Sequence, residues 1–403
     1  MSREMKDSGV EWIGEIPKSW NISKSKYFIK LHSGEPIEKQ IEKNDEFPYP
    51  IYGGGSLLGY TNKYNVNESN LLIGRVGSAG KITVLKNNAW ATDNALIVNH
   101  FNIDKSFLAF LLEAMNLQNL STSNAQPLIT SSKVLKQYIA YPDINTQKRI
   151  GEKVKKSTEK IDGIIKNTQH SIEELKKYKQ SLITEAVTKG LDKNVEMEDS
   201  GIEWMGHIPK NWDLTKINRL FSIKKDIANQ TGHDVLSVTQ SGLKVKDISR
   251  NEGQMAADYS KYQIVKPGDF VMNHMDLLTG WVDVATQEGV TSPDYRAFHA
   301  RNGKLVFSKF YLYVFQVCYM NKIFYGLGQG VSNLGRWRLQ TDKFLNFYLP
   351  LPSLKEQKEI VEFLDSKLLQ INSMLEQKEQ LLSELEHYKK SLIYEYVTGK
   401  KEV

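Results

Sequence analysis

The sequence predicts an α+β fold in two similar halves: two domains of mixed α/β fold, in a pseudo-twofold arrangement, joined by two long antiparallel helices that form a coiled coil. One observation is a repeated stretch, since DSGVEWIGEIPKSW at 7–20 returns as DSGIEWMGHIPKNW at 199–212 with ten identities in fourteen positions. A second is LKKYKQSLITEAVT at 175–188, which returns as LEHYKKSLIYEYVT at 385–398. The third is the helical spacing of apolar residues in and before both copies. Together they indicate a duplicated structural unit.

The long helices are predicted from about Thr146 to Thr188 and in the matching region of the second half. Apolar residues recur there at steps of three, four and seven, with charged residues between them and no proline. They are Ile150, Val154, Ile161, Ile165, Ile172, Leu175 and Leu182, and in the second copy Ile360, Leu364, Ile371, Leu375, Leu382, Leu385 and Leu392. A helix of about 40 residues is roughly 60 Å long, so we expect the two stripes to be buried on each other as a coiled coil. The alternative is that each helix packs on its own domain.

The second repeat extends beyond its conserved stretch. Its 210-residue offset continues without a gap back through Gln147 and Gln357 to Pro142 and Pro352, which are expected to end the preceding strands. Gly190 is expected to stop the first helix. The tail joined to the head, YEYVTGKKEV followed by MSREMKDSGVEW, resembles the internal TEAVTKGLDKNVEMEDSGIEW. We therefore expect the two chain ends to lie close to each other.

The regions 21–141 and 213–351 differ in sequence, and both mix short β-like runs with glycine-bearing turns. The first contains YPIYGGGSLLGYTNKYN, NLLIGRVGSAGKITVL and AWATDNALIV, and the second contains YQIVKPGDFVMNHMDLLTGWVDVATQEGVTSPDYRAF. Each also has a helix candidate, KSFLAFLLEAMNL or KFYLYVFQVCYMN. We expect two α+β domains of one fold with different surfaces.

Composition limits the classes of protein. The 403 residues carry a net charge of +6 with a pI near 8.9, which permits an anionic partner such as nucleic acid but is also common without one. The single cysteine, Cys318, excludes an internal disulfide and a cysteine-based zinc site. No apolar run at the start resembles a signal peptide, and FYLYVFQVCYM at 310–320 is too short to span a bilayer. We expect a cytoplasmic protein with no membrane partner.

Motifs of catalysis are missing from the sequence. GRVGSAGKIT resembles a phosphate-binding loop, but its glycine spacing is one residue too long and Ile82 stands where Ser or Thr binds magnesium. No GxGxxG opens a helix, no HExxH is present, and Cys318 lies in an apolar run rather than beside a base. Asp294 in SPDYRAF lacks the acidic-x-Lys strand of a nuclease core. We expect no catalytic, metal-binding or cofactor-binding residue in this chain.

Taken together, these features resemble the specificity subunit of type I restriction-modification systems. The stretches that carry the resemblance are SGVEWIGEIPKSW and its twin, LIGRVGSAGK with WATDNALIV, PGDFVMNHMDLLTGWVDV with GVTSPDYRAF, and the paired LKKYKQSLITEAVT and LEHYKKSLIYEYVT. The resemblance implies two target-recognition domains that each read one half of a split, asymmetric DNA sequence, and helices that set the spacer and dock two methyltransferase subunits. It also implies restriction and translocase subunits as partners, with S-adenosylmethionine, ATP and magnesium on the partners rather than on this chain.

Domain boundaries follow from the repeats and the resemblance. We expect target-recognition domain 1 at 1–142, long helix 1 at 143–190, a linker at 191–198, target-recognition domain 2 at 199–352, and long helix 2 with the tail at 353–403. A rigid coiled coil could hold two recognition domains near a multiple of one DNA turn, about 34 Å. A second hypothesis is a coiled-coil structural adaptor without base-specific recognition, which explains the helices but gives the divergent domains no task.

Candidate DNA-reading residues lie in the turns of the divergent regions. Aligning LLIGRVG on DFVMNHM places Arg75 opposite Asn273, and Arg suits a guanine edge while Asn suits an adenine edge. The alternative for Asn273 is that it only fixes a turn. The further candidates, whose Lys and Arg members could instead neutralise phosphate, are Tyr52, Lys81, Thr92, Asn94, Gln240, Ser292, Tyr295, Arg296, Gln329, Arg336 and Arg338.

The repeated stretch DSGVEWIGEIPKSW has a separate predicted role. Its apolar and aromatic positions Trp12, Ile16 and Trp20 are expected to brace each recognition domain against the end of the helix arriving from the other half. We expect this joint twice, because a duplicated frame has two equivalent corners.

Overall fold

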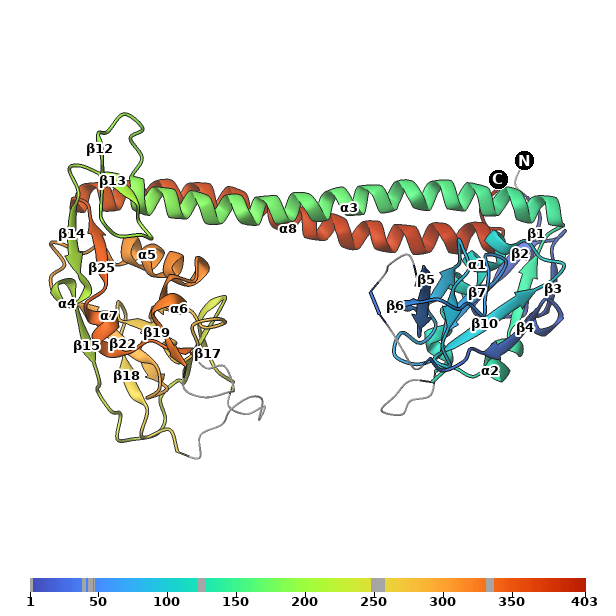
Figure 1. Ribbon diagram of the computed structural model, residues 1–403, viewed down its shortest axis with the longest axis horizontal. Helices are drawn as coiled ribbons and strands as arrows, with labels where there is room; N and C mark the ends of the chain where they lie inside the picture. The colour runs from blue at the N-terminus through green and yellow to red at the C-terminus, as the bar shows by residue number, and fades with distance from the viewer. Residues whose placement is uncertain are drawn as a thin grey trace. The chain divides into compact units, whose positions relative to one another are not determined.

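The computed structural model describes residues 3–37, 41–42, 46, 48–121, 128–247, 258–330 and 337–403 (Figure 1). The chain divides into two compact units: unit 1 comprises residues 1–170 and 378–403, and unit 2 comprises residues 171–377. Each unit therefore combines one divergent region with parts of both long helices. In the described part of the chain, no helix is both long and apolar enough to cross a membrane.

Unit 1 is built around a four-stranded antiparallel sheet with the order β4-β10-β7-β8. A three-stranded sheet, β6-β5-β9, lies beside it, and β1 pairs with β2 and β3 with β11. The strands are β1 (Met5–Asp7), β2 (Glu15–Pro17), β3 (Asn21–Lys24), β4 (Ile29–Ser33), β5 (Tyr49–Gly53), β6 (Ser56–Thr61), β7 (Leu71–Gly74), β8 (Ile82–Val84), β9 (Trp90–Ala91), β10 (Ala95–His100) and β11 (Tyr138–Tyr141). The short helices are η1 (Ser25–Tyr27), α1 (Lys105–Ala114), η2 (Leu117–Leu120) and α2 (Ser131–Leu135).

Unit 2 repeats this architecture with the sheet order β15-β22-β19-β20. Its strands are β12 (Met197–Asp199), β13 (His207–Pro209), β14 (Asp213–Lys216), β15 (Phe221–Lys224), β16 (Leu236–Thr239), β17 (Gly242–Val245), β18 (Gln263–Val265), β19 (Phe270–Met272), β20 (Val282–Val284), β21 (Gly289–Thr291), β22 (Arg296–Ala300), β23 (Gln329–Gly330), β24 (Trp337–Arg338) and β25 (Tyr348–Leu351). Its short helices are α4 (Ile217–Leu220), α5 (Ser308–Met320), α6 (Ile323–Leu327) and α7 (Thr341–Leu345). The expected α+β fold in two similar halves is confirmed.

The core of unit 2 is filled largely by aromatic rings. Phe270 and Phe298 stack with their centroids 5.0 Å apart, and Phe221 meets them edge-on at 5.4 and 5.6 Å. Such edge and stacked arrangements add to the free energy gained by burying the rings. Cys318 on α5 is fully buried in this core, and burial raises the pKa of its thiol. The apolar run of α5 is therefore a core helix, as its sequence predicts.

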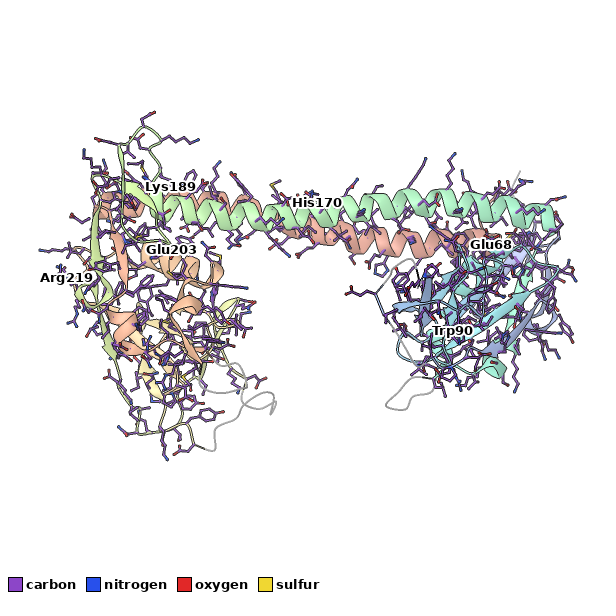
Figure 2. All side chains as sticks on the ribbon, viewed as in Figure 1. Glu68, Trp90, His170, Lys189, Glu203 and Arg219 are labelled. Carbon is purple, nitrogen blue, oxygen red and sulfur yellow. The ribbon has the colours of Figure 1, made fainter. Side chains whose placement is uncertain are left out.

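The two long helices are α3 (Ile144–Lys189) and α8 (Leu354–Val397). Figure 2 labels His170, the last residue of unit 1 on α3. In unit 1, Lys389 Nζ lies 2.7 Å from Asp162 Oδ1 across the helix pair, and in unit 2 Lys179 Nζ donates to Asn372 Oδ1 at 2.8 Å. Because α3 begins and α8 ends in unit 1, the helices run antiparallel (Figure 1). The apolar stripe predicted for each helix is buried or partly buried throughout.

In unit 1 the repeated stretch packs against the C-terminal end of α8. Ile16 and Trp20 are buried in the same core cluster as the last turns of α8, and Trp12 packs at its edge. Gly399, just beyond α8, has φ +75°, and a Cβ there would lie 2.6 Å from Pro17 Cδ. Only glycine accommodates this close approach. The predicted joint is therefore present in unit 1.

The equivalent corner of unit 2 has the same construction. Ile208 and Trp212 share a core cluster with Ile183 and Val187 of the last turns of α3. Gly190, which ends α3 as predicted, has φ +72°, and a Cβ there would lie 3.2 Å from Trp212 Cζ2. Each copy of the repeated stretch is thus a corner that joins a domain to the end of a long helix.

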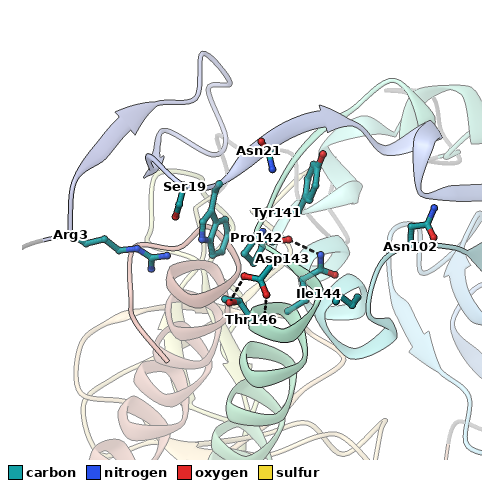
Figure 3. A pocket seen from close by; sticks show the side chains of 11 residues that line it. Arg3, Ser19, Asn21, Asn102, Tyr141, Pro142, Asp143, Ile144 and Thr146 are labelled. Atoms are coloured by element: carbon teal, nitrogen blue, oxygen red, sulfur yellow. Dashed lines mark hydrogen bonds between the residues drawn. The ribbon is translucent and has the colours of Figure 1, made fainter.

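In the part of the chain that the structure describes, the indole N–H of the last tryptophan of the repeated stretch has an acceptor in unit 2 but not in unit 1. Trp212 Nε1 donates to Glu356 Oε1 at 3.2 Å. Position 146 is the equivalent of 356 in unit 1, and there Thr146 donates through Oγ1 to Asp143 Oδ2 at 2.7 Å (Figure 3). This hydrogen bond lowers the pKa of Asp143. Among the described residues, the buried Nε1 of Trp20 has no acceptor.

A buried glutamine fixes the start of each long helix. Gln147 donates to Pro142 O at 2.9 Å and accepts from Asp104 N at 2.9 Å. Gln357 likewise accepts from Phe307 N at 2.8 Å, and its Nε2 donates to two further carbonyl oxygens at 3.0 Å. Every one of these partners is a backbone atom. Each helix is therefore fastened to its own domain through main-chain groups.

Candidate nucleic-acid interface

In unit 1 three loops converge at one end of the central sheet, following β5, β7 and β9. Gly54 N donates to Asn94 O at 3.1 Å, and Arg75 N donates to the same oxygen at 2.9 Å. The loop after β7 then returns to Lys81, whose N donates to the backbone of the same loop. Backbone hydrogen bonds thus bring Arg75, Lys81 and Asn94 together from separate parts of the sequence.

Two glycines allow this convergence. Gly54 has φ +57°, and a Cβ there would lie 2.3 Å from Val76 O. A Cβ on Gly55 would lie 2.9 Å from Cβ and Cδ of Lys81, so the lysine side chain runs directly over it. Since real Cβ atoms do not approach backbone oxygens so closely, the run of glycines is required by the loop contact.

The polar side chains of this loop cluster are available to a ligand. Lys81 and Asn94 are exposed and Arg75 is half-buried. Arg75 uses Nη1 to donate to Ser33 Oγ at 3.2 Å, and no other described residue accepts from its guanidinium. A guanidinium carries five N–H donors, so most remain for an external acceptor. Arg75 is therefore held in place by one hydrogen bond while its other N–H donors have no acceptor among the described residues.

Thr92 and Tyr52 occupy a different environment from the other candidates. Thr92 is only 4 % exposed, and its Oγ1 accepts from Asn94 N at 3.3 Å. Tyr52 is half-buried and packs on a small apolar cluster, while its carbonyl accepts from Thr92 N. We withdraw Thr92 as a candidate DNA-reading residue, because its side chain is buried. The sequence could not reveal this, since a polar residue in a turn is usually exposed.

In unit 2 the corresponding loops border a groove of about 670 Å³. It lies between the hairpin β16–β17 and the loops after β19 and β21. Asn273, Ser292 and Tyr295 line it, as do Lys244 and Lys246 of the hairpin. Cations, an amide, hydroxyls and an aromatic ring are groups that contact phosphates and base edges. The carboxylates of Asp276 and Asp294 line the same groove.

Asn273 has a structural task in this groove. Its Oδ1 accepts from Met275 N at 3.2 Å and from Asp276 N at 3.3 Å, which supports the interpretation that it fixes a turn. Its Nδ2 has no acceptor among the described residues. The side chain can therefore cap the turn and still donate to a ligand. Gln240, at the tip of the hairpin, is exposed and donates to Thr279 O at 3.4 Å.

The last candidates of unit 2 divide into exposed and buried residues. Gln329 and Arg338 are exposed on the paired strands β23 and β24. Arg296 is 4 % exposed, and its Nη2 donates to Leu339 O at 3.0 Å. The prediction that Arg296 reads DNA is therefore corrected, because its guanidinium is turned into the protein. Arg336 lies outside the described residues.

Sequence reasoning missed three residues of the groove. Lys244 and Lys246 lie on β17 and just after it, and Tyr262 lies before β18. Burial raises the pKa of Tyr262, so its hydroxyl stays protonated at neutral pH and can donate a hydrogen bond. The alternation in SGLKVK after a polar turn was the available signal for a hairpin with both lysines on one face.

Among the described residues, no group of three or more His, Cys, Asp or Glu side chains is placed to hold a metal ion. Whether a cofactor belongs to this chain therefore stays a prediction from the sequence.

A duplicated frame that carries two different loop clusters defines a class of proteins with two divergent recognition domains on one scaffold. The family described as type I restriction modification DNA specificity domain matches residues 17–174 and 209–386. These matches span most of the chain, one in each half, and the chain belongs to this family. The sequence resemblance is confirmed.

Relatives that are specificity subunits match either nearly the whole chain or part of it. The type I restriction enzyme MjaVIII specificity subunit of Methanocaldococcus jannaschii is 24% identical over 414 residues, which cover 96% of this chain and 93% of the relative. The type I restriction enzyme EcoprrI specificity subunit of Escherichia coli is 32% identical over 126 residues, 30% of this chain and 31% of that protein.

Solved structures show the same fold. A chain from a structure on complex assembly and conformational transition of the type I R-M system has a TM-score of 0.68 at 13% identity. The aligned region covers 96% of this chain and 99% of that chain. The HsdS subunit from Thermoanaerobacter tengcongensis has a TM-score of 0.51 at 13% identity, with coverage of 98% and 100%. At this identity the likeness supports the architecture alone.

Proposed function

We propose that this chain is the non-catalytic subunit that selects the DNA target of a type I restriction-modification complex. Unit 1 reads one half of a split, asymmetric sequence and unit 2 reads the other half. The observation that carries the proposal is the contrast within the duplication: corners, sheets and helices repeat, whereas the loop clusters at the sheet ends do not. Divergent reading surfaces on a repeated frame are what an asymmetric bipartite target requires.

Family membership supports the proposed partners. We propose that α3 and α8 fix the spacing of the half-sites and dock two methyltransferase subunits, and that restriction subunits join this complex. S-adenosylmethionine, ATP and magnesium then belong to those subunits, which perform the methylation, translocation and cleavage. The structural adaptor is the less favoured alternative, because it leaves the loop clusters without a role.

The test compares two variants, each serving as the control for the other. Arg75→Gln removes the guanidinium of the unit 1 cluster. Asn273→Asp keeps the Oδ1 acceptor that caps the turn but removes the Nδ2 donor. In a host that lacks its own copy, methylated bases are mapped with the full chain and its methyltransferase partner present.

The wild-type chain should direct methylation to a two-part motif with a fixed gap. Arg75→Gln should relax one half of the motif and Asn273→Asp the other, with about 1–3 kcal/mol of discrimination lost at the affected base pair. Methylation that is independent of this chain, or a single undivided motif, would show that the proposed function is wrong. Relaxation of the same half by both variants would show that the division between units is wrong.

A further inference from the structure

Arg338 lies on an exposed edge of unit 2. It belongs to β24, which pairs with β23 in the register Gln329↔Arg338. No described residue forms an ion pair or a side-chain hydrogen bond with its guanidinium. The next residue, Leu339, is fully buried. The chain therefore turns inward directly after a solvent-exposed cation.

The buried side chain of Arg296 is hydrogen-bonded to this turn. Its Nη2 donates to Leu339 O at 3.0 Å and to Thr341 Oγ1 at 3.3 Å. Its guanidinium carbon lies 4.5 Å from the ring centroid of Phe344, a cation–π distance. The backbone that carries Arg338 is therefore fastened to β22 through one buried side chain.

The charge of Arg296 has no acidic partner. Among the described residues no carboxylate pairs with Arg296 or Arg338, and Nη1 of Arg296 is buried without a hydrogen-bond acceptor. Desolvation, with a contribution from the like charge of Arg338, lowers the pKa of Arg296 to about 10. The group is still protonated at neutral pH. A buried, unpaired cation is destabilising, so stability alone does not account for it.

His274 lies on the other side of Leu339. Its carbonyl accepts from Leu339 N at 2.9 Å, and its ring is 7 % exposed with Nδ1 lacking a partner among the described residues. Desolvation, then Arg296 and Arg338, lower the pKa of His274 to about 3, so the ring is neutral. The local charge is thus that of two arginines, and an anion at Arg338 would relieve their mutual repulsion.

We propose that Arg338 binds a backbone phosphate of the DNA target, and that Arg296 is the positioning residue that fixes Arg338 and adds a second positive charge beneath it. The inference rests on the proposed DNA-binding function and deepens it. It assigns this edge of unit 2 to affinity and orientation, whereas Asn273 and the groove residues read bases. Phosphate contacts release counterions and carry no sequence information.

The experiment measures DNA binding by the full-length chain in complex with its methyltransferase partner. The duplexes are a cognate and a scrambled sequence, and salt is varied from about 50 to 200 mM. Arg338→Gln should lower affinity about tenfold on both duplexes, the effect of one charge-assisted hydrogen bond. It should also reduce the slope of log K against log salt by about 1.

Arg296→Met keeps the contact with Phe344 but removes the hydrogen bonds and the charge, and should give a similar loss. The double variant should lose little more than either single variant, because the second residue acts through the first. Arg296→Lys, which keeps the charge, should recover part of the salt slope. If Arg296→Met fails to fold, Arg296→Lys combined with Arg338→Gln provides the same test of non-additivity.

Arg219→Gln is the matched control. Arg219 is exposed on α4 and labelled in Figure 2, and its substitution changes the net charge equally. It should leave affinity and salt slope near wild type. A loss at Arg338 confined to the cognate duplex would assign that residue to base reading and overturn the proposal. Additive losses of affinity in the double variant, or an unchanged salt slope in Arg338→Gln, would also overturn the proposal. In a thermal-unfolding measurement of the complex, a larger increase in unfolding temperature with inorganic phosphate than with DNA would do the same. A wild-type complex that binds both duplexes equally would instead contradict the proposed function.

Discussion

The hydrogen bond between Trp212 and Glu356 allows a sharp test of the corner. Glu356→Ala removes the acceptor of the Trp212 indole, 3.2 Å away, and the Oε2 that accepts from Ser353 N at 3.2 Å and Ser353 Oγ at 2.9 Å. Loss of the glutamate half of this capping box costs about 1 kcal/mol, while Ser353 Oγ can still accept from the backbone N of residue 356. An indole N–H left without a partner costs about 1–3 kcal/mol more. We therefore expect unit 2 to lose about 2–4 kcal/mol of unfolding free energy.

The assay is thermal and urea unfolding followed by hydrogen exchange of peptides from each unit. For a unit of this size, at about 2–4 °C per kcal/mol, the loss corresponds to a decrease in unfolding temperature of about 4–16 °C. Thr146→Ala at the equivalent position of unit 1 is the control, because Trp20 Nε1 has no acceptor there to lose. It should change stability by less than about 0.5 kcal/mol. Equal effects of the two substitutions, or faster exchange in unit 1 on Glu356→Ala, would refute this account of the corner.

Three further predictions concern stability and one concerns reactivity. Gly54→Ala should cost about 1–3 kcal/mol of unfolding free energy and weaken recognition of one half-site, because its Cβ would lie 2.3 Å from a carbonyl oxygen. Gly77→Ala, where the Cβ would have open space around it, should cost less. Urea unfolding measures both variants. Lys389→Ala should cost less than about 1 kcal/mol, since the ion pair is partly exposed, and a larger loss in urea unfolding would contradict this. Because the pKa of His274 falls from 6.5 to about 3 on folding, the unfolded state binds more protons in that window. Stability should therefore decrease by at most about 1.4 kcal/mol per pH unit as pH falls, and His274→Gln should remove this slope. Cys318, buried with a raised thiol pKa, should react with a thiol reagent only at the rate at which unit 2 opens, as measured against hydrogen exchange.

The repeated parts of the fold could be predicted because their information is local or duplicated. The α3 and α8 stripes follow from apolar spacing, and the corner around Trp20 follows from the equal offsets of the two copies. Gly190 and Pro142 act through their own backbone restrictions, so the helix ends were also readable. The order of strands in each sheet was not predictable, because pairing depends on contacts between distant residues.

The candidate site was predicted in part. The glycine-bearing turns located Arg75, Lys81 and Asn94, and the loops do meet there. Arg296 was misjudged because a charged residue in a turn-rich stretch is normally exposed, and nothing local indicates the carbonyl that accepts from it. Lys244 was missed because its place in the groove depends on how a hairpin folds back on the sheet.

The glutamines at the start of α3 and α8 have a consequence for how such a protein can change. Within the described ranges, the side chains of Gln147 and Gln357 form hydrogen bonds only with main-chain atoms. A main-chain atom has the same hydrogen-bonding chemistry whatever side chain its residue carries. Substitutions in the adjoining domain therefore leave this fastening chemically unaltered, provided the local backbone path is kept. Substitutions in the loop clusters could therefore change the DNA sequence that is recognised, while the long helices and their attachment to the domains stay the same.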